Sequence, residues 1–168
     1  MLYFIPTPIG NLEDISQRSL RLLASLPLLF CEDTRVTKQL LKLIKERYNL
    51  EITQKRFISL HSHNELKVLE NLDPDIFMED CAYVSDAGMP CISDPGAALV
   101  KYCQLKKIDY EVLPGANAAL LAYASSGFSN PRFTFWGFLP PKEKALNDSL
   151  SIILNNQNPT IIYEAPHR

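Results

Sequence analysis

The sequence has no long hydrophobic run and no excess of charge of either sign. No apolar stretch in its 168 residues approaches the roughly 18 needed to cross a bilayer. The first residues after Met1 also lack the basic segment of a signal peptide. We therefore expect a cytoplasmic protein with no membrane partner. Seventeen basic against nineteen acidic residues give a net charge of −2, so nucleic-acid binding would require a local patch of cations.

Motifs of several common enzyme classes are missing. The chain has no Gly-x-Gly-x-x-Gly, no Gly-x-x-x-x-Gly-Lys-Ser/Thr and no Gly-x-Ser-x-Gly pattern. These absences disfavour dinucleotide-dependent, P-loop and serine hydrolase chemistry. Cys31, Cys81, Cys91 and Cys103 have neither zinc-ribbon nor Cys-x-x-Cys spacing. We expect buried, reduced thiols and no metal site.

Short apolar runs alternate with amphipathic stretches along most of the chain. Runs of this length are typical of strands that are covered on both faces, and the alternation predicts a parallel α/β sheet. We expect strands at residues 2–5, 28–31, 57–60, 82–84, 110–113, 133–136 and 160–163. We expect helices at 13–25, 34–47 and 94–106, and an Ala-rich helix after Gly115.

The pattern predicts two lobes and several helix starts. Residues 1–113 form the expected N-terminal α/β lobe, and residues 114–168 a linker helix and the start of a second α/β lobe. Since a two-stranded sheet is marginal by itself, we interpret this second lobe as incomplete. Asn11 with Asp14 resembles a capping box. Asp94 before Pro95 is the expected N-cap of the helix that follows.

Polar and small residues gather directly after the expected strands. In an open parallel sheet, ligands lie beyond the carboxyl ends of the strands, so these loops are the candidate site. Glu32 and Asp33 are candidate catalytic residues, because adjacent carboxylates there can orient a hydroxyl or accept its proton. The alternative is that both only stabilise the N-terminus of the next helix. His61 and His63 face the same side if their strand extends that far, which suits substrate contact or polar packing.

One helix carries a row of cations. Arg35, Lys38, Lys42 and Lys45 are spaced three, four and three residues apart, so they lie on one helical stripe. Such a stripe suits contact with RNA phosphates. An ordinary solvated helix face has the same pattern.

Six segments resemble, in order, the signatures of the ribosomal RNA small subunit methyltransferase I family, within the tetrapyrrole methylase superfamily. They are PTPIGNLED at 6–14, CEDTR at 31–35, HSHNE at 61–65, SDAGMPCISDPG at 85–96, PGANA at 114–118 and YEAPHR at 163–168. The family signature commonly has Glu where Ser62 stands. The resemblance covers the whole chain, although the family's proteins continue well beyond this length.

The resemblance implies a two-lobed α/β methyltransferase that acts as a homodimer and binds S-adenosylmethionine between its lobes. The implied reaction is 2′-O-methylation of a cytidine in 16S ribosomal RNA of the small subunit. Arg35, Lys38, Lys42, His61 and His63 are then candidates for substrate contact. The implied cofactor-binding residues are Pro8, Ile9, Gly10, Asp86, Ala87, Gly88, Pro90, Gly115, Ala116, Asn117 and Ala118. The alternative is that the glycines and prolines among them only shape turns.

Two other functions stay open at this point. One is methylation of a tetrapyrrole-type small molecule, which is disfavoured because that branch typically has a Gly-x-Gly-x-Gly-Asp first loop where this chain has PTPIGN at 6–11. The other is a non-catalytic binding or dimerisation fragment, because loss of part of the second lobe would remove one wall of the cleft.

Overall fold

The computed structural model describes residues 1–165, and the chain divides into two compact units. The first unit is Met1–Ala116, and the second begins at Asn117. The boundary that the sequence predicts, between residues 113 and 114, lies just before this division. Residues 166–168, which end the last of the six segments, lie outside the described residues.

A five-stranded sheet forms the centre of the first unit, in the order β3-β2-β4-β1-β5. Every neighbouring pair in it is parallel, which confirms the predicted parallel α/β class. The strands are β1 (Leu2–Phe4), β2 (Leu28–Cys31), β3 (Arg56–Ser59), β4 (Cys81–Val84) and β5 (Tyr110–Val112).

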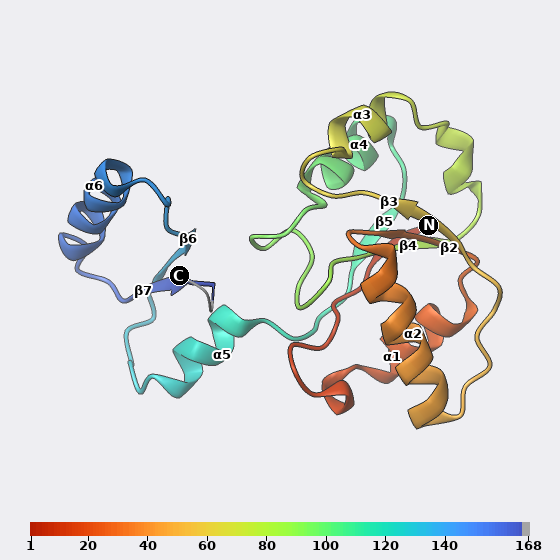
Figure 1. Ribbon diagram of the computed structural model, residues 1–168, viewed down its shortest axis with the longest axis horizontal. Coiled ribbons are helices and arrows are strands. Elements are labelled where there is room, and N and C mark those ends of the chain that lie inside the picture. The colour runs from red at the N-terminus through yellow and green to blue at the C-terminus, as the bar shows by residue number, and fades with distance from the viewer. Residues whose placement is uncertain (166–168) are drawn as a thin grey trace. The chain divides into compact units, whose positions relative to one another are not determined.

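Helices cover both faces of this sheet (Figure 1). On one face lie α1 (Gln17–Ser25) and α2 (Thr34–Tyr48), and on the other lie α3 (Glu65–Glu70), α4 (Ala97–Lys106) and the 3₁₀ helix η2 (Pro74–Met78). Successive strand residues alternate between the two cores. Leu29 and Cys31 pack towards α1 and α2, whereas Leu28 and Phe30 pack towards α3 and α4. This double burial explains why the strands have continuous apolar sequences.

Two helices begin later than the sequence predicts. Asn11 caps only the short 3₁₀ helix η1 (Leu12–Asp14), where its Oδ1 accepts from the Glu13 N–H at 3.1 Å. The helix α1 is capped instead by Ser16, whose Oγ accepts from the Ser19 N–H at 3.0 Å.

The expected capping role of Asp94 is wrong. The N-cap of α4 is Gly96, and no side chain caps this helix. The reason is that the loop closes on itself before the helix begins, because the Cys91 N–H donates to the Pro95 carbonyl at 3.2 Å. Pro95 therefore belongs to the loop and not to the first helical turn.

The second unit contains a parallel pair of strands joined by a helix. Its elements are α5 (Ala118–Ser125), β6 (Thr134–Phe138), α6 (Glu143–Leu154) and β7 (Thr160–Tyr163). The register of β6 against β7 shifts between Phe135 and Gly137, so Trp136 is an extra residue in the strand. The Tyr163 hydroxyl accepts from the Ala119 N–H at 3.1 Å and so ties β7 to α5.

The loop between β4 and α4 is held in an unusual backbone conformation. Gly88, Cys91, Ser93 and Gly96 all have left-handed φ angles, of 85°, 70°, 60° and 115°. For residues other than glycine this region costs about 1–2 kcal/mol, so Cys91 and Ser93 are strained. A Cβ atom added to Gly96 would lie 2.8 Å from Cε1 of the Tyr83 ring, which is too close for both atoms to fit.

We expect Gly96→Ala to lower the free energy of unfolding by about 2–3 kcal/mol, since strain and a steric clash with a buried ring combine. In Ser93→Gly the left-handed strain is removed at an exposed position in the same loop. That variant should be as stable as the parent chain or slightly more stable. Urea unfolding followed by circular dichroism measures both values, and equal destabilisation by the two changes would contradict this account.

Candidate functional site

The loops after β1 and β4 are joined to each other at the carboxyl edge of the sheet. The Thr7 N–H donates to the Gly88 carbonyl at 3.0 Å, and the Gly88 N–H returns a bond to the Thr7 carbonyl at 3.1 Å. The Thr7 hydroxyl also donates to the Ser85 carbonyl at 3.3 Å. A Cβ at Gly88 would lie 3.2 Å from Ile9 Cγ2. The predicted loops 8–10 and 86–90 therefore lie side by side.

The loop after β5 packs against the loops that follow β1 and β4. A Cβ at Gly115 would lie 2.4 Å from Cβ of Pro6, so only glycine allows this approach. The Ala116 carbonyl lies 3.8 Å from the position of a Cβ on Gly88. Asn117 and Ala118 belong to the second unit, where the Asn117 Oδ1 accepts from the Leu120 N–H at 3.1 Å and caps α5.

Two reciprocal hydrogen bonds connect the loops after β2 and β4. The Asp86 N–H donates to Glu32 Oε2 at 3.3 Å, and the Asp33 N–H donates to Asp86 Oδ1 at 3.1 Å. Each loop thus supplies a carboxylate to the backbone of the other. Because β2 and β4 are neighbours in the sheet, these two hydrogen bonds fix both loops relative to the strand ends.

Asp33 has a clear structural role. Its side chain accepts from the Arg35 N–H at 2.7 Å and caps α2, and it also pairs with the Arg35 guanidinium at 2.6 Å. These interactions lower the pKa of Asp33 to about 2. A carboxylate with such a low pKa is a weak proton acceptor.

The other three carboxylates at this edge have raised pKa values. Burial raises the pKa of Glu32, although the Asp86 N–H opposes the change. Burial also raises the pKa of Asp86, against the Asp33 N–H. For Asp94, burial and the nearby charge of Glu32 raise the pKa to about 6. Carboxylates with raised pKa values in a cleft are typical of functional sites.

The two histidines lie in a turn and not in a strand. The strand β3 ends at Ser59, so the condition under which both rings share one strand face is not met. Instead the His61 N–H donates to Asn64 Oδ1 at 2.8 Å, and the His63 N–H donates to His61 Nδ1 at 3.3 Å. The rings meet edge to face with centroids 6.0 Å apart.

The cations of α2 are exposed to solvent. Arg35 pairs with Asp33, and Lys42 Nζ lies 3.8 Å from Glu46 Oε1. Lys38 Nζ lies 5.2 Å from the centre of the Phe57 ring. All four cations of the stripe are exposed, so a ligand can reach them from solvent.

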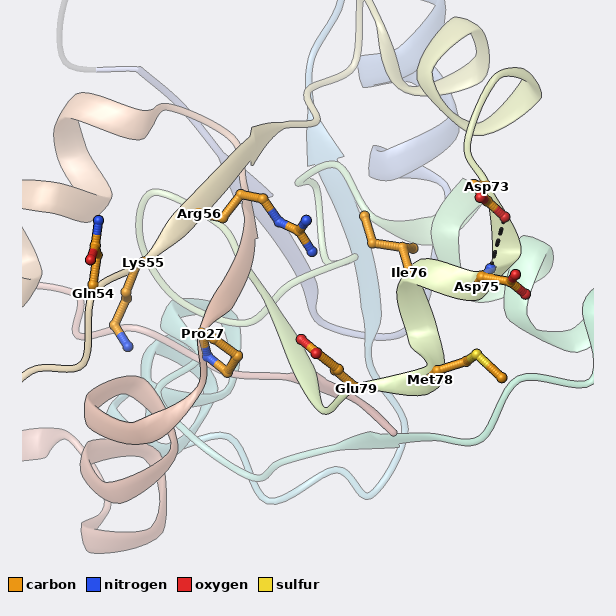
Figure 2. Close-up of a pocket in the computed structure, with 9 residues that line it drawn as sticks. All are labelled: Pro27, Gln54, Lys55, Arg56, Asp73, Asp75, Ile76, Met78 and Glu79. Atoms are coloured by element: carbon orange, nitrogen blue, oxygen red, sulfur yellow. Dashed lines mark hydrogen bonds between the residues drawn. The ribbon is translucent and has the colours of Figure 1, made fainter.

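The first unit has several hollows, and two of them lie at opposite ends of the strands. A cavity of about 240 Å³ lies at the carboxyl edge, between Pro8, Gly10, Asp86 and the exposed side of α2. A hollow of about 790 Å³ lies at the amino ends of β2 and β3, as Figure 2 shows. There Lys55 Nζ donates to the carbonyls of Ala24 and Leu26 at 3.1 and 2.6 Å, and burial lowers the pKa of Lys55 to about 8. This second hollow contains none of the predicted site residues.

Among residues 1–165, no group of three or more His, Cys, Asp or Glu side chains is placed to hold a metal ion. In the same part of the chain, no helix has the length and apolar character to cross a membrane.

Comparison with known proteins identifies the family. The model of the family "Tetrapyrrole (Corrin/Porphyrin) Methylases" matches residues 1–168. The chain belongs to the tetrapyrrole methylase family. This confirms the family resemblance of the six sequence segments and agrees with the observed fold.

Individual relatives are similar to this chain along its whole length. It is 52% identical to the ribosomal RNA small subunit methyltransferase I of Campylobacter fetus and 44% identical to that of Helicobacter pylori. Both alignments cover 100% of this chain but only 62% and 63% of the relatives. A solved structure, the native form of uroporphyrin III C-methyl transferase from Thermus thermophilus, matches 82% of this chain and 58% of its own with a TM-score of 0.56 at 16% identity. That match supports the fold alone.

The structure adds residues that the sequence reasoning missed. Val36, Gln39, Leu40 and Leu43 line the cavity at the carboxyl edge of the sheet. Val36 and Leu43 are 37% and 44% exposed. Their spacing at 36, 40 and 43 forms a second apolar stripe beside the one that contains Leu41 and Ile44. This second stripe is the sequence pattern from which the lining residues on α2 could have been predicted.

We expect Asp33→Asn to keep the cap of α2, because an Asn oxygen accepts the same N–H, but to lose the ion pair with Arg35. The pKa of Asp33 is lower in the folded chain (about 2) than its ordinary value of 3.8, so the ion pair stabilises the fold above about pH 4. The stability difference between the two proteins should shrink as the pH falls towards 2. Urea unfolding from pH 2 to 7 tests this, and a constant difference would contradict it.

Proposed function

We propose that this chain takes part in S-adenosylmethionine-dependent methylation of the 2′ hydroxyl of a cytidine in 16S ribosomal RNA. The observation that carries the proposal is the convergence of the loops after β1, β4 and β5, through the Thr7–Gly88 bonds and the contact of Gly115 with Pro6. The name of the relatives, ribosomal RNA small subunit methyltransferase I, supports RNA as the substrate class.

The residues at this edge fit a sulfonium nucleoside. No atom lies within 4 Å of the place of a Cβ on Gly10, so the backbone is open to a ligand there. The Ser85 hydroxyl is buried, and no hydrogen bond of ordinary geometry reaches it among the described residues. Asp86 offers a carboxylate suited to ribose hydroxyls. The cavity of about 240 Å³ is smaller than the roughly 300–1,000 Å³ of complete ligand pockets, so it suits part of the cofactor.

The chain's own contribution to the reaction is mainly positioning. S-adenosylmethionine supplies a methyl group that is already activated by the positive sulfur. The loops at 8–10 and 86–90 bind and orient the cofactor together with Gly115 and Ala116. Glu32 orients the substrate hydroxyl from the opposite loop, whereas Asp33 holds the start of α2. Alignment of the reacting atoms accounts for a large part of the acceleration in such displacements.

The exposed cations provide the contact with RNA. Arg35, Lys38 and Lys42 extend from α2 beside the cavity that Val36 and Leu40 line, and they attract phosphates. His61 and His63 lie at the next loop along the sheet edge and contact the substrate there.

The proposal includes the setting in which the protein acts. A substrate in the small ribosomal subunit places the chain in the cytoplasm, and we propose that it works as a homodimer. Sedimentation equilibrium measures that state directly, and a single species of 19.0 kDa would exclude the homodimer.

The first experiment separates the candidate functions. Calorimetry with S-adenosylmethionine is combined with transfer of a labelled methyl group to small ribosomal subunits and to a tetrapyrrole. Binding with transfer to RNA supports the proposal. Transfer only to the tetrapyrrole, or no binding of the cofactor, would each overturn it.

We expect Gly88→Val to weaken binding of S-adenosylmethionine by at least about tenfold. A side chain there meets Ile9 at 3.2 Å in a left-handed backbone, so the joined loops must separate. The matched control is Gly127→Val, because Gly127 is also left-handed but has no atom within 4 Å of its Cβ position. Calorimetry should give the control the affinity of the parent chain, and equal losses would refute the role of the loop contact.

We expect Lys38→Ala with Lys42→Ala to weaken binding to small ribosomal subunits and to lower the salt dependence of log K by about one for each lost cation. The control is Lys101→Ala, an exposed lysine on α4. Filter binding at several salt concentrations measures the slopes. If Lys101→Ala changes the slope as much as the change at either α2 lysine, the stripe has no special role.

A further inference from the structure

The cavity of about 240 Å³ at the carboxyl edge has two walls of different character. One wall consists of the loop residues Pro8 and Gly10 together with Asp86, and the proposed cofactor lies along it. The opposite wall belongs to the helix α2. We call it the α2 wall, and its residues are Val36, Gln39, Leu40 and Leu43.

The α2 wall is an apolar surface that the fold leaves partly uncovered. Val36 and Leu43 are 37% and 44% exposed, and Leu40 is half-buried. Residues 36, 40 and 43 are spaced four and three apart, so they share one face of the helix. The residues by which α2 packs on the sheet form a separate, buried stripe. The apolar part of the α2 wall is therefore available to a flat apolar group of a ligand.

Gln39 adds a hydrogen-bonding group to this apolar wall. Its side-chain amide is exposed and forms no hydrogen bond within residues 1–165. An amide offers two donors and one acceptor with two lone pairs. The Watson–Crick edge of a pyrimidine likewise combines donors and acceptors, so one amide can form two hydrogen bonds with it. A carboxylate or an ammonium group offers only one of the two kinds.

Two cations flank Gln39 on the surface of α2. Arg35 lies four residues before it and Lys42 three residues after it, so both are its neighbours on the helix. Both side chains are exposed, so phosphates on either side of a nucleotide can reach them while its base passes Gln39. Because S-adenosylmethionine carries no phosphate, this arrangement favours RNA as the source of a base on the α2 wall.

The same cavity reaches the carboxylates of the site. Asp86 lines it, and the Asp86 N–H donates to Glu32 Oε2 at 3.3 Å. Glu32 is the residue for which we propose contact with the substrate hydroxyl. A nucleotide whose base lies on the α2 wall has its ribose next to this hydrogen bond. Methyl transfer also requires the donor carbon and the acceptor oxygen to meet, so cofactor and nucleotide must share one cavity.

We propose that this cavity is the pocket for the base of the target nucleotide, with the ring against Leu40 and Leu43 and its edge hydrogen-bonded to Gln39. This inference rests on the proposed function. The cavity is below the roughly 300–1,000 Å³ of complete ligand pockets, which suits a single pyrimidine ring beside a part of the cofactor. Entry of the base requires it to leave its stack, as bases in single-stranded loops of RNA do.

The first test measures the base directly in the free chain, with cytidine 5′-monophosphate and ribose 5-phosphate as probes. Both carry one phosphate, and only the first carries a base. NMR titration should show the nucleotide binding at least about fivefold more tightly. Gln39→Leu keeps the size of the side chain but removes its hydrogen bonds, so it should lose most of this preference. Gln54→Leu, the same change at an exposed residue at the other end of the strands, should keep it.

The second test uses methyl transfer to small ribosomal subunits. Gln39→Leu should raise KM for the subunits about tenfold. Calorimetry should give this variant the parent affinity for S-adenosylmethionine within about threefold, because the cofactor lies on the opposite wall. The slope of log K against log salt should also stay at the parent value, since loss of an uncharged side chain releases no counterions. Loss of the lysines of α2 lowers that slope, so the two kinds of contact are distinguishable.

The outcomes separate this inference from the function on which it rests. Equal affinities of the parent chain for the two probes overturn the base pocket, even if methyl transfer to RNA is observed. Parent-like probe preference and KM in Gln39→Leu overturn it as well. A loss of cofactor affinity in Gln39→Leu also overturns it, because the α2 wall would then serve the cofactor. If the parent chain transfers no methyl group to the small subunit, the proposed function fails and the inference fails with it, whatever the probes bind.

Discussion

The parallel pairing of β1 with both β4 and β5 is the constraint on which the rest of the edge depends. Parallel strands end at the same side of a sheet, so the loops that follow these three strands emerge next to one another. The paired bonds of Thr7 with Gly88 and the contact of Gly115 with Pro6 are possible only in this order. Small residues occupy the contacts because the loop backbones themselves approach closely there.

The pairing of β2 with β4 determines which charged side chains lie close together at the carboxyl edge. It places Glu32 and Asp33 opposite Asp86, and like charges at short range would repel. Backbone N–H groups offset this, because each loop donates one to a carboxylate of the other. The result is a partly buried acidic edge in which Asp33 titrates near 2 and Asp94 near 6. Groups of one chemical type with separated pKa values can take different roles in one site.

Local sequence patterns predicted the strands better than the helix starts. Residues 28–31 and 160–163 match β2 and β7, because short apolar runs between turn residues are a local signal of strands. The starts of α1 and α4 were wrong by several residues, since Asn11 and Asp94 both have the residue types of a cap. Ser16 and Gly96 cap those helices instead, and the choice depends on how the preceding loop closes. The shared strand face expected for His61 and His63 failed for a similar reason, because β3 ends at Ser59.

The sequence by itself determined the parallel α/β class, the family and the identity of the loops at the edge, because apolar periodicity and motif order are properties of the linear chain. Only the tertiary structure gave these carboxylates their different surroundings. Glu32, Asp33, Asp86 and Asp94 are alike as residues, and their differences come from backbone donors on another strand, from burial and from neighbouring charges. The cavity is also a product of the tertiary structure. Val36 and Leu43 of α2 line it only because the loop that contains Pro8 and Gly10 lies beside them.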